Sequence, residues 1–158
     1  MLQRIFPERL DNHYHGHSLA LWLFYPITFM NVVIDLVAIF KSDGGAQSAD
    51  GIPLDTFVSG GAQAVIYVVA LLGLSGLLLG FLSVLALVRY RAMVPLMYVL
   101  LVVDYLGHKG IALMKPIVRT GTSSGGYVSV TLFALTLTGL VLSLRGKGYL
   151  SGREGAST

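Results

Sequence analysis

The chain has 158 residues, of which 54% are apolar and 12% are charged, whereas an ordinary soluble domain carries about 25% charged residues. This composition excludes a water-soluble surface over most of the chain. The net charge of +3 comes from Lys and Arg side chains that lie mostly at the ends of apolar segments, which is typical of membrane topology and not of nucleic-acid binding, and the absence of cysteine excludes disulfides and thiolate metal sites.

Four apolar stretches are long enough to cross a membrane. A helix needs about 20 apolar residues to span the hydrocarbon core. The stretches that meet this length are residues 18–40, 62–88, 93–114 and 127–144. The sequence therefore predicts an all-α fold, an integral membrane bundle of four transmembrane helices that forms one domain over residues 18–144. Residues 145–158 are predicted to be a polar C-terminal tail.

Residues 1–17 precede the first span and mix apolar with charged side chains. Leu2, Ile5, Phe6 and Leu10 alternate with polar residues in a pattern that favours a short amphipathic segment on the membrane surface. A loosely ordered tail is the alternative.

Three histidines alternate just before the first span, at His13, His15 and His17. On an extended backbone their imidazoles would lie on one side, and neutral imidazole suits Zn, Cu or Ni. A helical backbone would spread them apart, and the segment would then face lipid headgroups. The three histidines are therefore a weak candidate for a metal site, and no other cofactor is predicted.

Ionisable residues inside the predicted spans are the strongest site candidates, because a charge at the bilayer centre costs at least about 2.5 kcal/mol. Asn31 and Asp35 share one face of the first helix, and Asp104 and His108 share one face of the third, followed by Lys109. We expect Asp35 to pair with His108 or Lys109, and Asp104 to bond to His108 or to a hydroxyl of the fourth helix. This polar pocket between the two helices is either proton-responsive or ligand-binding, or it is a structural clamp that fixes the helix register.

The second span carries a stripe of small residues, Gly73, Gly76, Gly80 and Ser83. Such a stripe lets another helix backbone approach closely, so it predicts a packing face. The partner helix belongs either to the same chain or to another membrane protein.

The distribution of Lys and Arg predicts that both termini are cytoplasmic. Seven of these residues then lie inside: Arg4, Arg9, Arg89, Arg91, Arg145, Lys147 and Arg153. Four lie outside: Lys41, Lys109, Lys115 and Arg119.

Catalytic signatures such as a nucleophile elbow, a Walker loop, a zincin motif or a dinucleotide fingerprint are absent from the sequence, which disfavours an enzyme. We expect a non-catalytic accessory subunit or a lipid- and partner-binding module, in contact with the bilayer and with other membrane helices but not with nucleic acid. One alternative is a protein that handles a small ligand, a proton or a metal with Asp35, Asp104 and His108. A second alternative is a small intramembrane enzyme that uses the same residues.

Four segments of the chain resemble a group of short proteobacterial membrane proteins. These segments read GHSLALWLF at residues 16–24, ADGIPLDTF at 49–57, VRYRAMVPLM at 88–97 and PIVRTGT at 116–122. The resemblance extends over nearly the whole chain and implies a bacterial inner-membrane protein with four spans. The group is uncharacterised, so the resemblance implies no activity and no site residues.

Overall fold

A computed structural model of the protein describes residues 5, 12, 14, 16–120 and 124–145. These residues are helical or in loops, and four helices are long and apolar enough to cross a membrane. They are α2 (Ser18–Phe40), α3 (Ser59–Val88), α4 (Val94–Met114) and α5 (Ser124–Leu144). The predicted all-α membrane bundle is therefore confirmed. Most of the predicted N-terminal interfacial segment and of the C-terminal tail lies outside the described residues.

The helices differ from the predicted spans mainly at their starts. α2 has the predicted bounds, whereas α3 and α5 each begin three residues before the apolar run, and α4 follows a short 3-10 helix, η2 (Arg91–Met93). The early residues are small and polar, such as Ser59 and Gly60, and they continue the helix without adding hydropathy. As a result α3 has 30 residues, compared with 21 each for α4 and α5.

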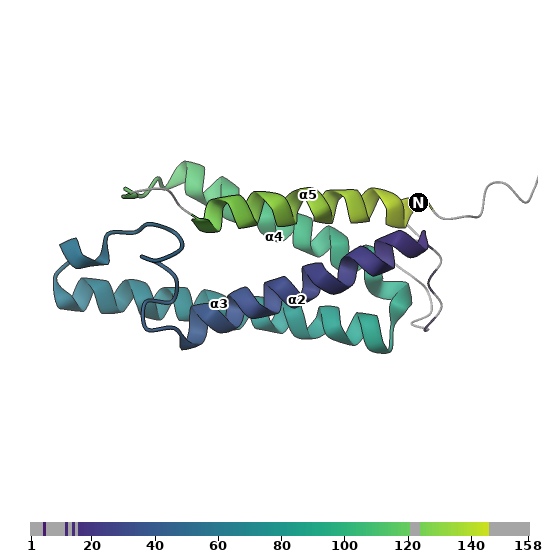
Figure 1. The fold of residues 1–158 in the computed structure, drawn as a ribbon, viewed down its shortest axis with the longest axis horizontal. Coiled ribbons are helices and arrows are strands. Elements are labelled where there is room, and N and C mark those ends of the chain that lie inside the picture. The colour runs from purple at the N-terminus through teal and green to yellow at the C-terminus, as the bar shows by residue number, and fades with distance from the viewer. Residues whose placement is uncertain (1–4, 6–11, 13, 15, 121–123, 146–158) are drawn as a thin grey trace, which may run out of the picture.

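The helices run alternately up and down. Figure 1 shows α2 beside α3 and α5 beside α4, and α2 also contacts α5. We call the end with the connections after α2 and α4 the loop end. The opposite end, where residues 89–93 join α3 to α4 and where α2 begins, is the hairpin end.

The buried core lies at the hairpin end. Its members come from the first half of α2, the last part of α3 and the start of α4: Ala20, Phe24, Ile27, Ala86, Leu87, Val94, Met97 and Tyr98. In α5 the buried residues also fall in the second half of the helix, near this end. No residue of α4 beyond Tyr98 is buried. The loop-end half of the bundle is therefore much more open than the hairpin-end half.

Tyr98 joins three helices in this core. Its hydroxyl donates a hydrogen bond to the backbone carbonyl of Ala20 on α2, over 2.7 Å, and its ring centroid lies 4.8 Å from that of Phe24. The ring also lies against Gly139 of α5 so closely that a Cβ there would collide with it. A glycine is thus needed at position 139 for α4, α5 and α2 to meet.

A second contact ties the segment before α2 to the end of α5. The hydroxyl of Tyr14 donates a hydrogen bond to Oγ of Ser143, over 3.0 Å. Burial raises the pKa of Tyr14, and the bond to Ser143 only partly opposes this effect. The phenol therefore stays protonated at neutral pH and remains a donor.

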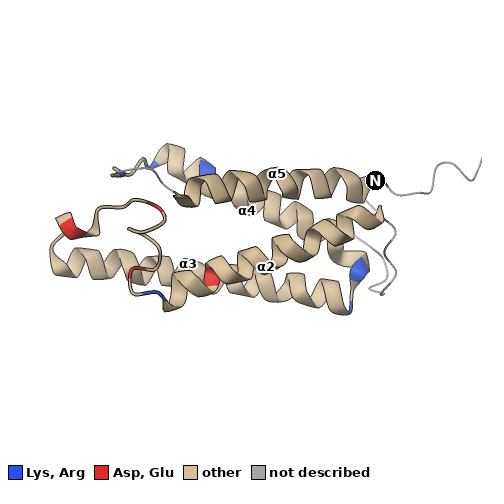
Figure 2. Ribbon diagram, in the orientation of Figure 1, with Lys and Arg blue, Asp and Glu red and all other residues tan. Residues whose placement is uncertain are grey.

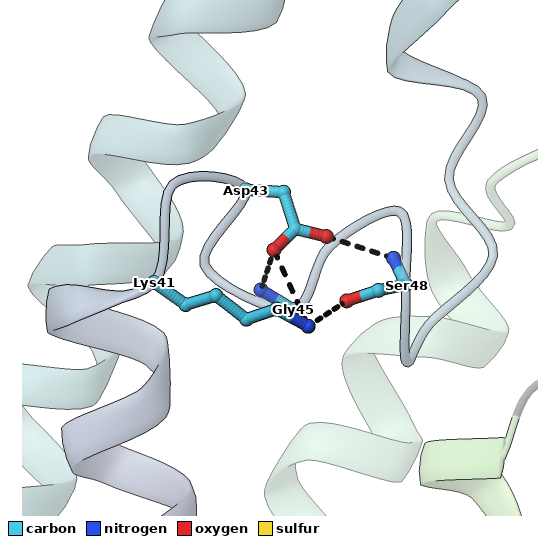
Figure 3. A network of polar contacts seen from close by, with 4 residues as sticks. All are labelled: Lys41, Asp43, Gly45 and Ser48. Carbon is cyan, nitrogen blue, oxygen red and sulfur yellow. Dashed lines mark hydrogen bonds and ion pairs between the residues drawn. The ribbon is translucent and has the colours of Figure 1, made fainter.

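The loop after α2 is held by the carboxylate of Asp43 (Figure 3). Asp43 accepts hydrogen bonds from the backbone N–H groups of Gly45, over 3.1 Å, and Ser48, over 2.9 Å. Lys41 lies 3.7 Å from the same carboxylate and also donates to Oγ of Ser48. Gly44 and Gly45 both have positive φ, at 59° and 81°, a conformation that glycine adopts readily. The result is a compact turn at the loop end.

This loop also docks on the connection between α4 and α5. The N–H of Thr120 donates to the carbonyl of Gly51 over 2.8 Å, and the N–H of Gly125 donates to the carbonyl of Ala49 over 3.0 Å. The two helical hairpins are therefore joined at both ends of the bundle, by side chains at the hairpin end and by backbone bonds at the loop end.

The Asp43 turn should depend on pH. Desolvation acts to raise the pKa of Asp43, but hydrogen bonds from Ser48 and Gly45 and the charge of Lys41 outweigh it and hold the pKa well below the usual range. A depressed pKa in the folded state means that the stabilisation is present above the unfolded value of about 3.9 and is lost as the pH falls below it. We expect hydrogen-exchange protection of the Gly45 and Ser48 amides to fall about tenfold in Asp43→Asn at neutral pH, because a charge-assisted bond is replaced by a neutral one. Equal protection in the variant and the native chain would contradict this role.

Candidate functional site

Asp35 is placed by the contact between α2 and α3. The carboxylate lies directly on Gly76 of α3, where an added Cβ would be only 2.6 Å from Cγ of Asp35. Glycines on either side keep the two helices close, since a Cβ at Gly73 would lie 2.8 Å from that of Ala38 and one at Gly80 would lie 2.8 Å from Cγ2 of Val32. The side chain of Asp35 is therefore held in the seam between α2 and α3, at half-burial.

The small-residue stripe of α3 faces α2 within the same chain. Gly73, Gly76 and Gly80 all contact α2, as the preceding distances show, and Ser83 is buried with its hydroxyl donating back to the carbonyl of Leu79 over 3.0 Å. The glycines leave the space that the Asp35 carboxylate occupies. The same residues therefore allow α2 to pack closely on α3 and hold the carboxylate in place.

Asp104 and His108 form a pair on α4. Nδ1 of His108 lies 2.9 Å from the backbone carbonyl of Asp104 and 3.4 Å from its Oδ2. Their spacing of four residues places them on one face of the helix. The side chains are 52% and 59% exposed, respectively, although both lie inside a span. Ionisable groups in this position are expected to meet water, a ligand or another protein.

Asp35 forms no ion pair with either member of this pair. Among the described residues it has no cation within 4.0 Å, so the predicted ion pair with His108 or Lys109 does not form. The reason is rotational, because Asp35 points toward α3 while the two candidate partners lie on α4. We name these three residues, Asp35, Asp104 and His108, the polar cluster.

The other two residues predicted for this site lie at its edge. Asn31 is half-buried one turn before Asp35. Nζ of Lys109 lies 5.4 Å from the ring centroid of Tyr105, which stacks on Phe133 of α5 at 4.0 Å. Lys109 therefore packs toward an aromatic pair on the α5 side and does not neutralise the polar cluster.

Sequence reasoning missed two glycines on α4. A Cβ added at Gly107 or at Gly110 would have no heavy atom of the described residues within 4 Å, so this part of the chain leaves their helix face uncovered. The neighbouring Val103 and Met114 are 60% and 74% exposed. The spacing of the two glycines was the available signal, but the sequence does not show which face of a lipid-embedded helix the chain itself covers.

Of the three alternating histidines, one lies within the described residues. His13 and His15 lie outside the described residues, whereas His17 is the N-cap of α2 and its Nδ1 accepts a hydrogen bond from the N–H of Leu19 over 3.2 Å. Within the described ranges no three His, Cys, Asp or Glu side chains gather closely enough to hold a metal ion. The structure assigns His17 a capping role.

Comparisons with known proteins add no relative to this description. No protein family model, no curated protein and no solved structure matches the chain.

Proposed function

We propose that this chain is a non-catalytic accessory subunit of a bacterial inner membrane, and that it binds a transmembrane helix of a partner protein against α4. The observation that carries this proposal is the uncovered face at Gly107 and Gly110. Helices associate in lipid through close backbone approach at small residues, because lipid tails compete for ordinary apolar contacts.

The other mid-span glycines make this face distinctive. Gly73, Gly76 and Gly80 of α3 are filled by α2, and Gly139 of α5 is filled by the ring of Tyr98. None of the described residues fills the equivalent space on α4, which leaves it open to lipid or to another protein. The half-exposed Asp104 and His108 border the same helix half, and lipid tails would leave them without polar partners. A partner helix can pack its backbone against the two glycines and place polar side chains beside Asp104 and His108.

Charge supports an orientation with both termini in the cytoplasm. Figure 2 shows most of the charged residues toward the two ends of the bundle, with one acidic residue inside α2. In the sequence, seven Lys or Arg residues lie before the first span, between the second and third spans or after the fourth, and four lie near the other two connections, while the long loop carries Asp43, Asp50 and Asp55. By the positive-inside rule, this distribution favours a cytoplasmic hairpin end.

Substitution of the two glycines tests the accessory role. We expect the double variant Gly107→Leu, Gly110→Leu to stay folded, because open space surrounds both positions, and to lose its stoichiometric partner on gentle extraction from the native membrane. The measurement is native mass spectrometry of the extracted complex.

Gly60→Leu is the matched control, since Gly60 is also a helical glycine, at the start of α3, where an added Cβ would meet no described atom within 4 Å. It should keep the partner. Retention of the partner by the double variant, or self-association as the only assembly of the native chain, would contradict the proposal.

A further inference from the structure

We propose that the partner helix that binds α4 carries an arginine at mid-span, and that its guanidinium pairs with the carboxylate of Asp104. The pairing rests on the proposed function, because it specifies the chemistry of the partner at the same face of α4. Three features of this face support it, namely the depth of Asp104, its lack of a basic neighbour, and the open space beside it.

Asp104 lies at the middle of a membrane span. It is the central residue of α4, which has 21 residues from Val94 to Met114. The helical rise places its Cα about 15 Å from either end of the helix. The side chain is 52% exposed, so the described residues leave much of it uncovered. Lipid headgroups stay at the membrane surface and acyl chains offer no polar group, so lipid leaves the carboxylate without a partner at this depth.

No Lys or Arg of the described residues pairs with Asp104. Its ion-pair partner there is His108, whose Nδ1 lies 3.4 Å from Oδ2 and 2.9 Å from the backbone carbonyl of Asp104. A proton on Nδ1 satisfies that carbonyl and leaves Nε2 of a neutral imidazole as an acceptor. The adjacent Lys109 has its Nζ 5.4 Å from the ring centroid of Tyr105, on the α5 side. Asp104 and His108 together therefore offer acceptors and a negative charge.

The surface beside Asp104 has room for a long side chain. Gly107 follows one turn later on the same face, and a Cβ added there would meet no described atom within 4 Å. A helix backbone that packs on Gly107 therefore places its own side chains near the carboxylate. Ile111 continues this face, is 56% exposed, and offers apolar contact to the rest of the partner helix.

An arginine fits these groups better than other polar side chains do. Its guanidinium has five N–H donors in a planar fork and no acceptor, so it can bond both oxygens of a carboxylate and reach an imidazole one helical turn away. It also supplies the positive charge that a carboxylate inside the membrane requires. A serine or glutamine supplies a hydrogen bond without this charge, and a lysine supplies the charge without the fork.

A second copy of the chain does not supply such a group. Copies inserted in the same orientation have parallel α4 helices, so a symmetric contact would place two Asp104 carboxylates side by side at one depth, where they repel. The helices α2, α3 and α5 contain no Lys or Arg. Inside its spans a copy could therefore offer only Lys109, which lies beside Tyr105 on the α5 side.

Model helices in lipid vesicles test the pairing. The probes are labelled leucine–alanine peptides that span phosphatidylcholine vesicles and carry arginine, glutamine or leucine at the central position. Fluorescence energy transfer to the full-length chain measures their binding. We expect the arginine peptide to bind about tenfold more tightly than the leucine peptide, because only arginine forms a charged hydrogen-bonded pair. Equal affinity of these two peptides, or stronger binding of the glutamine peptide, would overturn the proposal.

Substitutions identify the carboxylate that the arginine peptide contacts. Asp104→Asn should lose the preference for arginine, whereas Asp55→Asn, which makes the same change in net charge at an exposed position of the long loop, should keep it. Asp104→Arg should reverse the preference and bind a peptide with a central glutamate. An arginine preference that survives in Asp104→Asn would sink the pairing.

The native partner separates the pairing from the accessory role. We expect Asp104→Asn to release the partner on gentle extraction, and the span of that partner to contain a basic residue. Retention of the partner by Asp104→Asn, together with its loss from the Gly107→Leu, Gly110→Leu variant, would overturn the pairing and leave the accessory role intact. Loss from Asp104→Asn with retention by the double variant would count against packing on the glycines and not against the pairing.

Discussion

Replacing Gly139 by leucine is expected to destabilise the bundle by about 3 kcal/mol, the upper range for overpacking a closed core. A single Cβ at this position already collides with the ring of Tyr98. Relief requires Tyr98 to move, which breaks its 2.7 Å hydrogen bond to the carbonyl of Ala20 and its contact with Phe24. The loss should therefore reach α2 as well as α4. Unfolding in SDS, followed by circular dichroism, measures the change.

A double-mutant cycle separates this mechanism from a general effect of leucine. Combining Gly139→Leu with Tyr98→Ala removes the collision, so the double variant should be less destabilised than the sum of the single variants. Strict additivity would show that the ring of Tyr98 is not what Gly139 accommodates.

Replacing Gly76 by leucine is expected to separate α2 from α3 at the seam, at a cost of about 2–3 kcal/mol. The new side chain would take the space of the Asp35 carboxylate, and the flanking contacts at Gly73 and Gly80 are too close to adjust without moving the helix backbone. The displaced carboxylate would also lose its place in the seam between α2 and α3.

Gly110→Leu provides the comparison for this effect, because it adds the same side chain to a mid-span glycine where an added Cβ would meet no described atom within 4 Å. It should unfold at the same SDS fraction as the native chain. Equal destabilisation by Gly76→Leu and Gly110→Leu would mean that leucine acts through the lipid and not through the α2–α3 seam.

The number, type and approximate bounds of the helices could be predicted from the sequence because each depends on local apolar length alone. In lipid, the backbone N–H and C=O groups of a spanning segment must be hydrogen-bonded within that segment. An apolar run of sufficient length therefore forms a helix. α2 has its predicted bounds for this reason. The predicted starts of α3 and α5 are late because small polar residues continue a helix without an apolar signal.

The rotation of each helix could not be predicted in the same way. In water, the apolar face of a helix marks its buried side, but lipid is as apolar as a protein core, and this signal disappears. The sequence predicts that Asp35 pairs with His108 or Lys109, yet it does not show that the Asp35 side chain turns toward Gly76 of α3. The hydrogen bond between Gly51 and Thr120 could not be predicted either, because it joins backbone groups of two loops that are far apart in the sequence.

The 30 residues of α3 make it about 45 Å long, whereas the 21 residues of α4 and α5 make each about 32 Å, close to a hydrocarbon thickness of about 30 Å. α3 must therefore tilt, or extend beyond the acyl chains, in any bilayer that suits its neighbours. Changes in acyl-chain length consequently alter the mismatch of α3 first, and they act on the helix against which the Asp35 carboxyl rests. Membrane thickness is thus a physical variable that acts on the contact between α2 and α3.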